Sequence, residues 1–89
     1  MIQRDITIIN KLGLHARAAS KLVNLCSRFA SEVFLDKNGN RVNAKSIMGV
    51  MMLAASQGTS MTLEVEGEDE QACADAVTAL VENRFDEPE

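Results

Sequence analysis

The chain has 89 residues, of which 46% are hydrophobic and 25% are charged, and its net charge is −4. This size supports one modest core and leaves no room for a separate substrate domain. Residues 1–49 hold eight Lys/Arg against three Asp/Glu, whereas residues 50–89 hold one against ten. The basic half predicts an anionic ligand or an acidic protein partner, and the alternative is that folding spreads these charges over the surface.

The residue inventory argues against several classes of protein. One histidine, His15, and two distant cysteines, Cys26 and Cys73, give no metal-ligand spacing, so we expect no metal site. Both cysteines fall in helical apolar patterns, which predicts buried, reduced thiols in a cytoplasmic protein. No apolar run approaches spanning length, so we expect no membrane insertion. With three Phe and no Tyr or Trp, we expect no nucleic-acid partner.

The first half of the chain predicts a strand, a helix and a hairpin. Residues 2–9 are rich in β-branched side chains, which predicts a strand, and residues 10–13 break it. From residue 16 the apolar residues recur at helical spacing, which predicts an amphipathic helix. They are Ala19, Leu22, Val23, Cys26 and Phe29. Residues 31–36 and 41–44 predict two further strands, joined by a tight turn at Asn38-Gly39.

The second half predicts a helix, a strand and a last helix. Ser46 stands where a helix over 47–56 would begin, and Gly58 supplies its stop. Residues 59–66 alternate as a half-buried antiparallel strand does. The helix predicted over 69–83 has an apolar stripe of Ala72 or Cys73, Ala76, Val77 and Leu80. We expect a single domain at 1–84 and a short, loose acidic tail at 85–89.

This order of elements predicts an α+β fold. A four-stranded, mainly antiparallel sheet covered on one face by three helices (βαββαβα) would bury all of the apolar stripes.

The segment Gly13-Leu14-His15-Ala16-Arg17 is the main functional candidate. It places His15 where an extended segment gives way to a helix, and a helix start offers unpaired N–H groups and the positive end of the dipole to an anion. Arg17 adds a fork of donors suited to phosphate. A phosphoryl group on the imidazole would be stabilised there. The alternative is that His15 is a surface or capping residue.

Ser46 and the residues after it allow two interpretations each. Ser46 as N-cap would accept a hydrogen bond from the N–H of Met48 or Gly49, which by itself explains a serine there. Ile47, Met48 and Met51 are either core residues or an exposed, adaptable docking face beside His15.

Four segments resemble one family, the histidine-containing phosphocarrier proteins (HPr) of the phosphoenolpyruvate-dependent phosphotransferase system. They are Gly13-Leu14-His15-Ala16-Arg17, Asn43-Ala44-Lys45-Ser46-Ile47-Met48, Gln57-Gly58-Thr59 and Gly67-Glu68-Asp69-Glu70. The resemblance runs almost from end to end and implies the family's open-faced β-sandwich. At position 18, where many members have proline, this chain has Ala18, which keeps an N–H that proline lacks.

The resemblance implies that His15 accepts a phosphoryl group from enzyme I, itself charged by phosphoenolpyruvate, and passes it to an EIIA-type domain. Arg17 and the backbone N–H groups of Ala16, Arg17 and Ala18 would hold the phosphate. This implies a monomeric carrier without a cofactor, rather than an enzyme with turnover of its own.

The resemblance also implies regulation, whereas the docking surface is our hypothesis from the residues themselves. In some members the residue matching Ser46 is phosphorylated by an ATP-dependent kinase, HPr kinase/phosphorylase. The docking surface would comprise Ile47, Met48 and Met51 with Lys21. Sugar uptake and a regulatory nitrogen branch (NPr-like) remain open as roles, and the rival is a non-carrier binding module controlled at Ser46.

Overall fold

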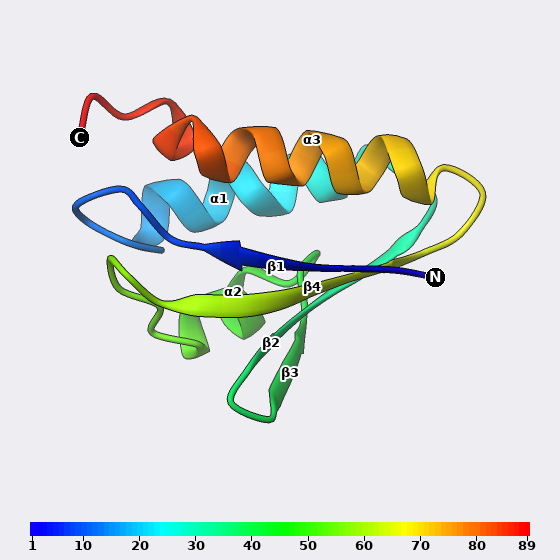
Figure 1. Cartoon of the computed structure of the whole chain (residues 1–89), viewed down its shortest axis with the longest axis horizontal. Coiled ribbons are helices and arrows are strands. Elements are labelled where there is room, and N and C mark those ends of the chain that lie inside the picture. The colour runs from blue at the N-terminus through cyan, green and yellow to red at the C-terminus, as the bar shows by residue number, and fades with distance from the viewer.

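A four-stranded antiparallel sheet is the frame of the computed structural model, which describes residues 1–89 (Figure 1). The strands lie in the order β1-β4-β2-β3, and every neighbouring pair is antiparallel. The elements in chain order are β1 (Ile2–Thr7), α1 (Ala16–Cys26), β2 (Glu32–Lys37), β3 (Asn40–Asn43), α2 (Ile47–Met52), β4 (Ser60–Glu66), α3 (Glu70–Glu82) and the 3-10 helix η1 (Arg84–Asp86). The predicted α+β fold, a four-stranded sheet with three helices, is confirmed.

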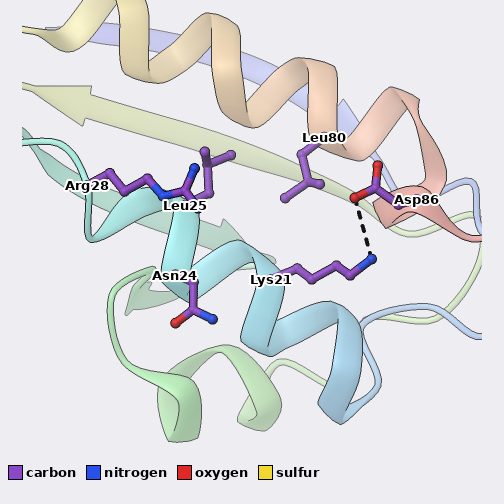
Figure 2. Close-up of a pocket in the computed structure, with 6 residues that line it drawn as sticks. All are labelled: Lys21, Asn24, Leu25, Arg28, Leu80 and Asp86. Carbon is purple, nitrogen blue, oxygen red and sulfur yellow. Dashed lines mark hydrogen bonds and ion pairs between the residues drawn. The ribbon is translucent and has the colours of Figure 1, made fainter.

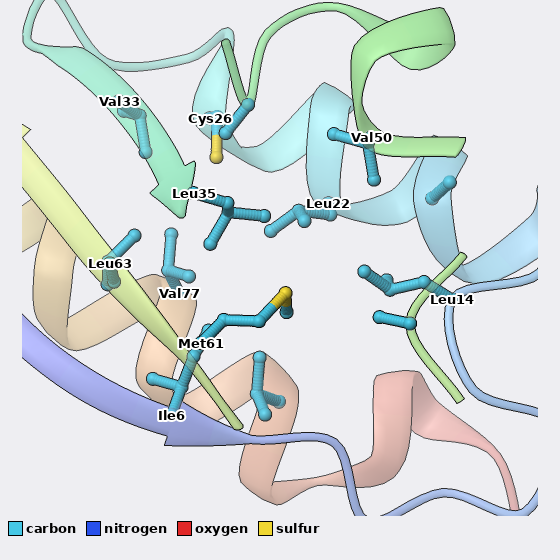
Figure 3. Close-up of a cluster of buried hydrophobic side chains, with 14 of the residues drawn as sticks. Ile6, Leu14, Leu22, Cys26, Val33, Leu35, Val50, Met61, Leu63 and Val77 are labelled. Carbon is cyan, nitrogen blue, oxygen red and sulfur yellow. The ribbon is translucent and has the colours of Figure 1, made fainter. Parts of the chain in front are cut away.

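One face of the sheet carries the core. Along β4 the residues Met61, Leu63 and Val65 are buried while their neighbours are more exposed, as the alternating pattern predicts. Cross-strand partners continue this face, since Leu35 of β2 lies opposite Leu63. Figure 3 shows Leu35, Met61 and Leu63 pointing into one cluster with labelled residues of α1, α2 and α3. The result is the open-faced sandwich, with its other sheet face free.

Helix α1 uses the predicted apolar stripe. Ala19, Leu22 and Cys26 are buried, and Val23 and Phe29 pack against the core while keeping some exposure. Cys26 and Cys73 are both free and buried, as predicted. Burial raises the pKa of the Cys26 thiol to about 12, so the thiol stays protonated and behaves as a small apolar side chain.

The hairpin between β2 and β3 has the predicted turn. Asn38 and Gly39 both have positive φ, at 51° and 89°, which is the backbone that an Asn-Gly pair adopts in a two-residue hairpin turn. The Asp36 carboxylate accepts a hydrogen bond from the Gly39 N–H at 2.9 Å and so supports the turn.

Helix α2 is shorter than the predicted 47–56. It ends at Met52, and Ala54 then takes a left-handed conformation with φ at 49°. This change of direction buries Ala55 and lets its carbonyl accept a hydrogen bond from Leu14 N–H at 2.8 Å. A longer helix would have lost that contact with the loop before α1, and Gly58 is not needed as a stop.

Helix α3 buries two of the predicted positions, Cys73 and Val77, but its apolar face is rotated from the rest of the predicted stripe. Its buried residues are Cys73, Ala74, Val77 and Val81, while Ala76 and Leu80 are half-buried and Ala72 is exposed. Alanines at 72, 74, 76 and 79 make several faces equally apolar, so contacts with β1, β4 and α1 decide the orientation. With 13 residues it is the longest helix, and none of the helices is long and apolar enough to cross a membrane.

The C-terminal residues do not form the loose tail that we expected. Phe85 is fully buried in the core. Residues 84–86 all have positive φ, between 53° and 64°, and turn the chain back toward the start of α1 (Figure 1). An acidic segment that ends near a proline gives no local sign of this turn, because burial of a single aromatic ring stabilises it.

Phe85→Ala tests the anchoring of this segment. We expect the free energy of unfolding to fall by about 3–5 kcal/mol, because a fully buried ring is replaced by a cavity. Urea unfolding followed by circular dichroism measures the change. Met52→Ala is the control, since Met52 is 80% exposed and its loss should cost less than about 0.5 kcal/mol. Equal stability of the two variants would show that the C-terminal segment does not contribute to the core.

Candidate functional site

His15 is the N-cap of α1, as the sequence predicts. Its backbone is extended, with φ at −73° and ψ at 175°, and its carbonyl accepts the first helical hydrogen bond from Ala19 N–H at 2.9 Å. The N–H groups of Ala16, Arg17 and Ala18 come next, and none of them donates to another group of the chain. Ala16 and Arg17 are exposed, whereas Ala18 is buried. This helix start can therefore receive an anion beside the imidazole ring.

A glutamate from the far end of the chain contacts His15. Nε2 of the ring is paired with Oε2 of Glu87, and Oε1 of the same carboxylate accepts a hydrogen bond from Asn10 Nδ2 at 2.9 Å. These hydrogen bonds, led by the one from Asn10, hold the pKa of Glu87 below its usual value. Sequence analysis missed this residue, since no local pattern joins positions that are 72 residues apart.

Asn10 ties the two sides of the site together. It is fully buried, and its Nδ2 also donates to the carbonyl of Gly13 at 2.9 Å. The same amide group thus holds both the loop before α1 and the Glu87 carboxylate. A buried amide with two acceptors restricts the position of each of them.

Arg17 lies on the open side of this arrangement. It is exposed, and with Lys11, Leu12 and Glu87 it lines a shallow cleft that the end of the chain completes with Pro88 and Glu89. Its positive charge helps to lower the pKa of Glu87. The structure therefore places Arg17 in the same cleft as the Glu87 carboxylate, as a group that attracts anions.

Lys21 is partly held by the C-terminal segment. Its Nζ donates to the carbonyl of Phe85 at 3.0 Å and pairs with the Asp86 carboxylate at 3.4 Å (Figure 2). Figure 2 also shows Asn24 and Arg28 along the same side of α1, in a cleft between α1 and the end of α3. The structure thus places Lys21 in a polar cleft rather than among the apolar residues of α2.

The acidic end of the chain folds back onto the basic half. Lys11 pairs with Glu89 at 3.5 Å, His15 pairs with Glu87, and Lys21 pairs with Asp86. The separation of charge along the sequence is therefore partly cancelled in space, which is the alternative left open by the sequence.

Ser46 caps α2, and this interpretation is confirmed. Its backbone is extended and its Oγ accepts a hydrogen bond from Gly49 N–H at 3.2 Å. Asn43 supports the same turn, since its Oδ1 accepts from Lys45 N–H at 2.8 Å. Ser46 is exposed, so its hydroxyl is also within reach of a partner protein.

The methionine-rich helix is mostly exposed rather than core. Only Val50 of α2 is buried, and Ile47, Met48 and Met51 are 41%, 72% and 41% exposed. Sequence analysis missed Met52, which is the most exposed of the group. These four side chains form one apolar surface, which we call the α2 surface, and α2 packs against α1. Such flexible, apolar side chains suit contact with another protein.

Comparison with known proteins decides the family. The family model described as "PTS HPr component phosphorylation site" matches residues 2–83. The chain belongs to the HPr family. Phosphocarrier protein HPr of Cupriavidus necator is 61% identical over 89 residues, which is 100% of both chains.

Solved structures agree with this assignment. The crystal structure of HPr-C-His from Thermoanaerobacter tengcongensis has a TM-score of 0.97 and 44% identity, covering 100% of both chains. An HPr dimer from the same organism has a TM-score of 0.79 and 45% identity, over 98% of this chain and 100% of that one. The chain is thus a phosphocarrier of the phosphotransferase system, a relay component rather than a catalyst.

The Glu87 contact predicts a pH-dependent contribution to stability. Because folding lowers the pKa of Glu87 below its ordinary 4.5, the contribution is complete above that value and is lost as the pH falls through the lower, folded pKa. We expect the free energies of unfolding of the parent and Glu87→Gln to differ above pH 4.5 and to converge in acid. Urea titrations at a series of pH values measure this difference.

Glu89→Gln is the matched control for this experiment. The Glu89 carboxylate also pairs with a basic side chain, Lys11, but it is 71% exposed. Its removal should therefore change the free energy of unfolding by at most about 1 kcal/mol. A difference between Glu87→Gln and the parent that does not change with pH would contradict the expected linkage.

Proposed function

We propose that the chain carries a phosphoryl group on His15, accepts it from enzyme I charged by phosphoenolpyruvate, and delivers it to an EIIA-type domain. The observation that carries this proposal is the position of the imidazole at the N-cap of α1, directly before three free N–H groups. The family supports a phosphocarrier. This histidine is the chain's one imidazole, so it is the natural nucleophile of such a carrier.

Each neighbouring group has a role in this mechanism. The ring nitrogen attacks phosphorus while the bond to the donor's leaving group breaks, and negative charge stays on the phosphoryl oxygens. The N–H groups of Ala16, Arg17 and Ala18 and the positive end of the helix dipole stabilise that charge. The Arg17 guanidinium adds donors from the exposed side.

The α2 surface is the proposed docking surface for both partners. Ile47, Met48 and Met51 are exposed, adaptable side chains, which lets one surface fit both a donor and an acceptor. Lys21 contributes positive charge on α1, although Asp86 partly neutralises it. We include Lys21 as an electrostatic contact for acidic partners.

Ser46 is a proposed regulatory site. Its exposed hydroxyl at the start of α2 is accessible to an ATP-dependent kinase such as HPr kinase/phosphorylase. A phosphate there would be accepted by the helix start yet would place a double negative charge next to the α2 surface. Phosphorylation would therefore weaken docking of acidic partners without unfolding the chain.

The proposed carrier works as a cytoplasmic monomer, in sugar uptake or in a regulatory nitrogen branch. A monomer would leave the α2 surface available to each partner in turn. The HPr dimer from Thermoanaerobacter tengcongensis shows that a relative can also pair. The rival proposal, a binding module controlled at Ser46, does not need the His15 site.

Phosphorylation by enzyme I tests the carrier function. With enzyme I and phosphoenolpyruvate but no ATP, we expect one acid-labile phosphoryl group in the intact mass of the parent and none in His15→Ala. Arg17→Ala should be phosphorylated about 100-fold more slowly, because it lacks one charge-stabilising donor group. No modification by an enzyme I shown to be active on another carrier would favour the binding module.

Met48→Asp tests the docking surface. A carboxylate in an apolar contact is costly to desolvate, so we expect KM for the carrier in the enzyme I reaction to rise about tenfold, or about 1.4 kcal/mol, while the fold is kept. Gln3→Asp places the same new charge on the free face of the sheet and should leave KM unchanged. Equal KM values for Met48→Asp and the parent would exclude this surface.

A further inference from the structure

The contact between His15 and Glu87 defines where the imidazole proton lies. The ring makes one hydrogen bond within the chain, through Nε2, and its partner is a carboxylate oxygen. The lowered pKa of Glu87 keeps that carboxylate ionised near neutral pH, so it can only accept. Nε2 must therefore be the nitrogen that carries the proton in the neutral ring, and Nδ1 keeps a free lone pair.

The carboxylate is held in place from several directions. Its second oxygen accepts from the buried Asn10 amide at 2.9 Å, and its side chain is only 14% exposed. Two residues earlier, Phe85 anchors the segment in the core, and its carbonyl accepts from Lys21 at 3.0 Å. Glu87 is thus held in the site by contacts with Asn10 and His15 and by the anchored residue Phe85.

We propose that Glu87 is a positioning residue for phosphoryl transfer at His15. It holds the proton on Nε2 and orients the ring so that Nδ1 is the nitrogen that takes the phosphoryl group. This inference rests on the proposed carrier function and adds a residue from the C-terminal segment to its site. The C-terminal segment is therefore part of the same site as the start of α1.

The transfer step balances without any proton leaving the ring. The Nδ1 lone pair forms the new N–P bond, and the electrons of the broken bond leave with the donor's group. The ring then carries phosphorus on Nδ1 and hydrogen on Nε2, which makes it cationic. The Glu87 carboxylate faces this new positive charge and stabilises it, while Arg17 and the free N–H groups face the phosphoryl oxygens.

Other charges around the ring act differently. Lys11 and Glu89 pair with each other at the edge of the cleft, at 3.5 Å, and Arg17 is exposed at its mouth. None of these three makes a hydrogen bond to the ring. Glu87 is therefore the one carboxylate whose removal should change the position of the ring proton.

Glu87→Gln tests this proposal, because it keeps the shape of the side chain but replaces the acceptor oxygen that faces Nε2 with an NH₂ donor. Asn10 Nδ2 already donates to the position of Oε1, so the amide oxygen of the glutamine will take that place and its NH₂ group will face Nε2. Nε2 must then accept, and the ring proton moves to Nδ1. Glu87→Ala removes the carboxylate, so that no group of the chain fixes which ring nitrogen carries the proton.

The first readout is the nitrogen-15 NMR spectrum of the His15 ring, recorded at a pH where the ring is neutral. We expect the proton on Nε2 in the parent and in Glu89→Gln, and on Nδ1 in Glu87→Gln. This readout needs no partner protein. If the contact only anchored the C-terminus, Glu87→Gln would not move the proton from Nε2 to Nδ1. A proton on Nδ1 in the parent would overturn the proposal, even if the variants failed to fold.

The second readout is the rate of phosphorylation by enzyme I and phosphoenolpyruvate. We expect Glu87→Gln to react about tenfold more slowly than the parent, which is typical when a hydrogen-bond partner that orients a functional histidine is lost, and more slowly than Glu87→Ala. Glu89→Gln should react as the parent does. Phosphorus-31 NMR of the parent should show the phosphoryl group on Nδ1.

The outcomes separate this proposal from the carrier function. A phosphorylated parent with equal rates for Glu87→Gln would overturn the role of Glu87 and leave the carrier function standing. A parent that an active enzyme I does not phosphorylate would overturn both, whatever the nitrogen-15 spectrum shows.

Discussion

The site depends on the close approach of two backbone segments, the loop before α1 and the turn after α2. A Cβ at Gly13 would lie 2.5 Å from the carbonyl oxygen of Ala55, and Gly13 also has φ at 67°, so glycine is required twice over. This approach allows the Leu14 N–H to bond to Ala55 and buries the Leu14 side chain. Leu14 therefore anchors the chain directly before His15, the N-cap of α1.

The same approach explains why α2 is short and exposed. The chain leaves the helix at Met52 and brings Ala55 to the loop, and Val50 is the one residue within α2 that enters the core. The remaining apolar side chains of α2 are left at the surface, on a helix that packs against α1. Placing His15 and exposing the α2 surface are thus two results of one packing constraint.

Local patterns predicted the parts of this structure that local physics decides. The N-cap position of His15, the Asn38-Gly39 turn, the cap at Ser46 and the alternation in β4 each depend on residues within a few positions of one another. The helix start and Arg17 already predicted a phosphoryl group on His15, and the family resemblance then indicated the donor and acceptor of that group. In this way the centre of the candidate site could be identified from the sequence.

The remaining parts depend on contacts between distant segments. The end of α2 and the turn at 84–86 use left-handed residues other than glycine, which tertiary packing stabilises and no propensity predicts. The face of α3 was ambiguous because its alanines are interchangeable in an apolar pattern. Glu87 could not be predicted for two reasons. It follows the left-handed turn at 84–86, and its partner His15 lies 72 residues away in the sequence.

A carboxylate beside a phosphate site needs a physical explanation, because the two charges repel. The ring itself provides one: Glu87 is bound at Nε2, while the phosphoryl group is proposed to arrive at Nδ1, on the other side of the imidazole. The cationic ring of the phosphorylated state then lies between two negative groups and attracts both. Asn10 stabilises the carboxylate before transfer, so the site need not rearrange when the phosphoryl group arrives. A preformed acceptor of this kind lowers the cost of reorganisation in each transfer, which suits a carrier that must gain and lose the same group.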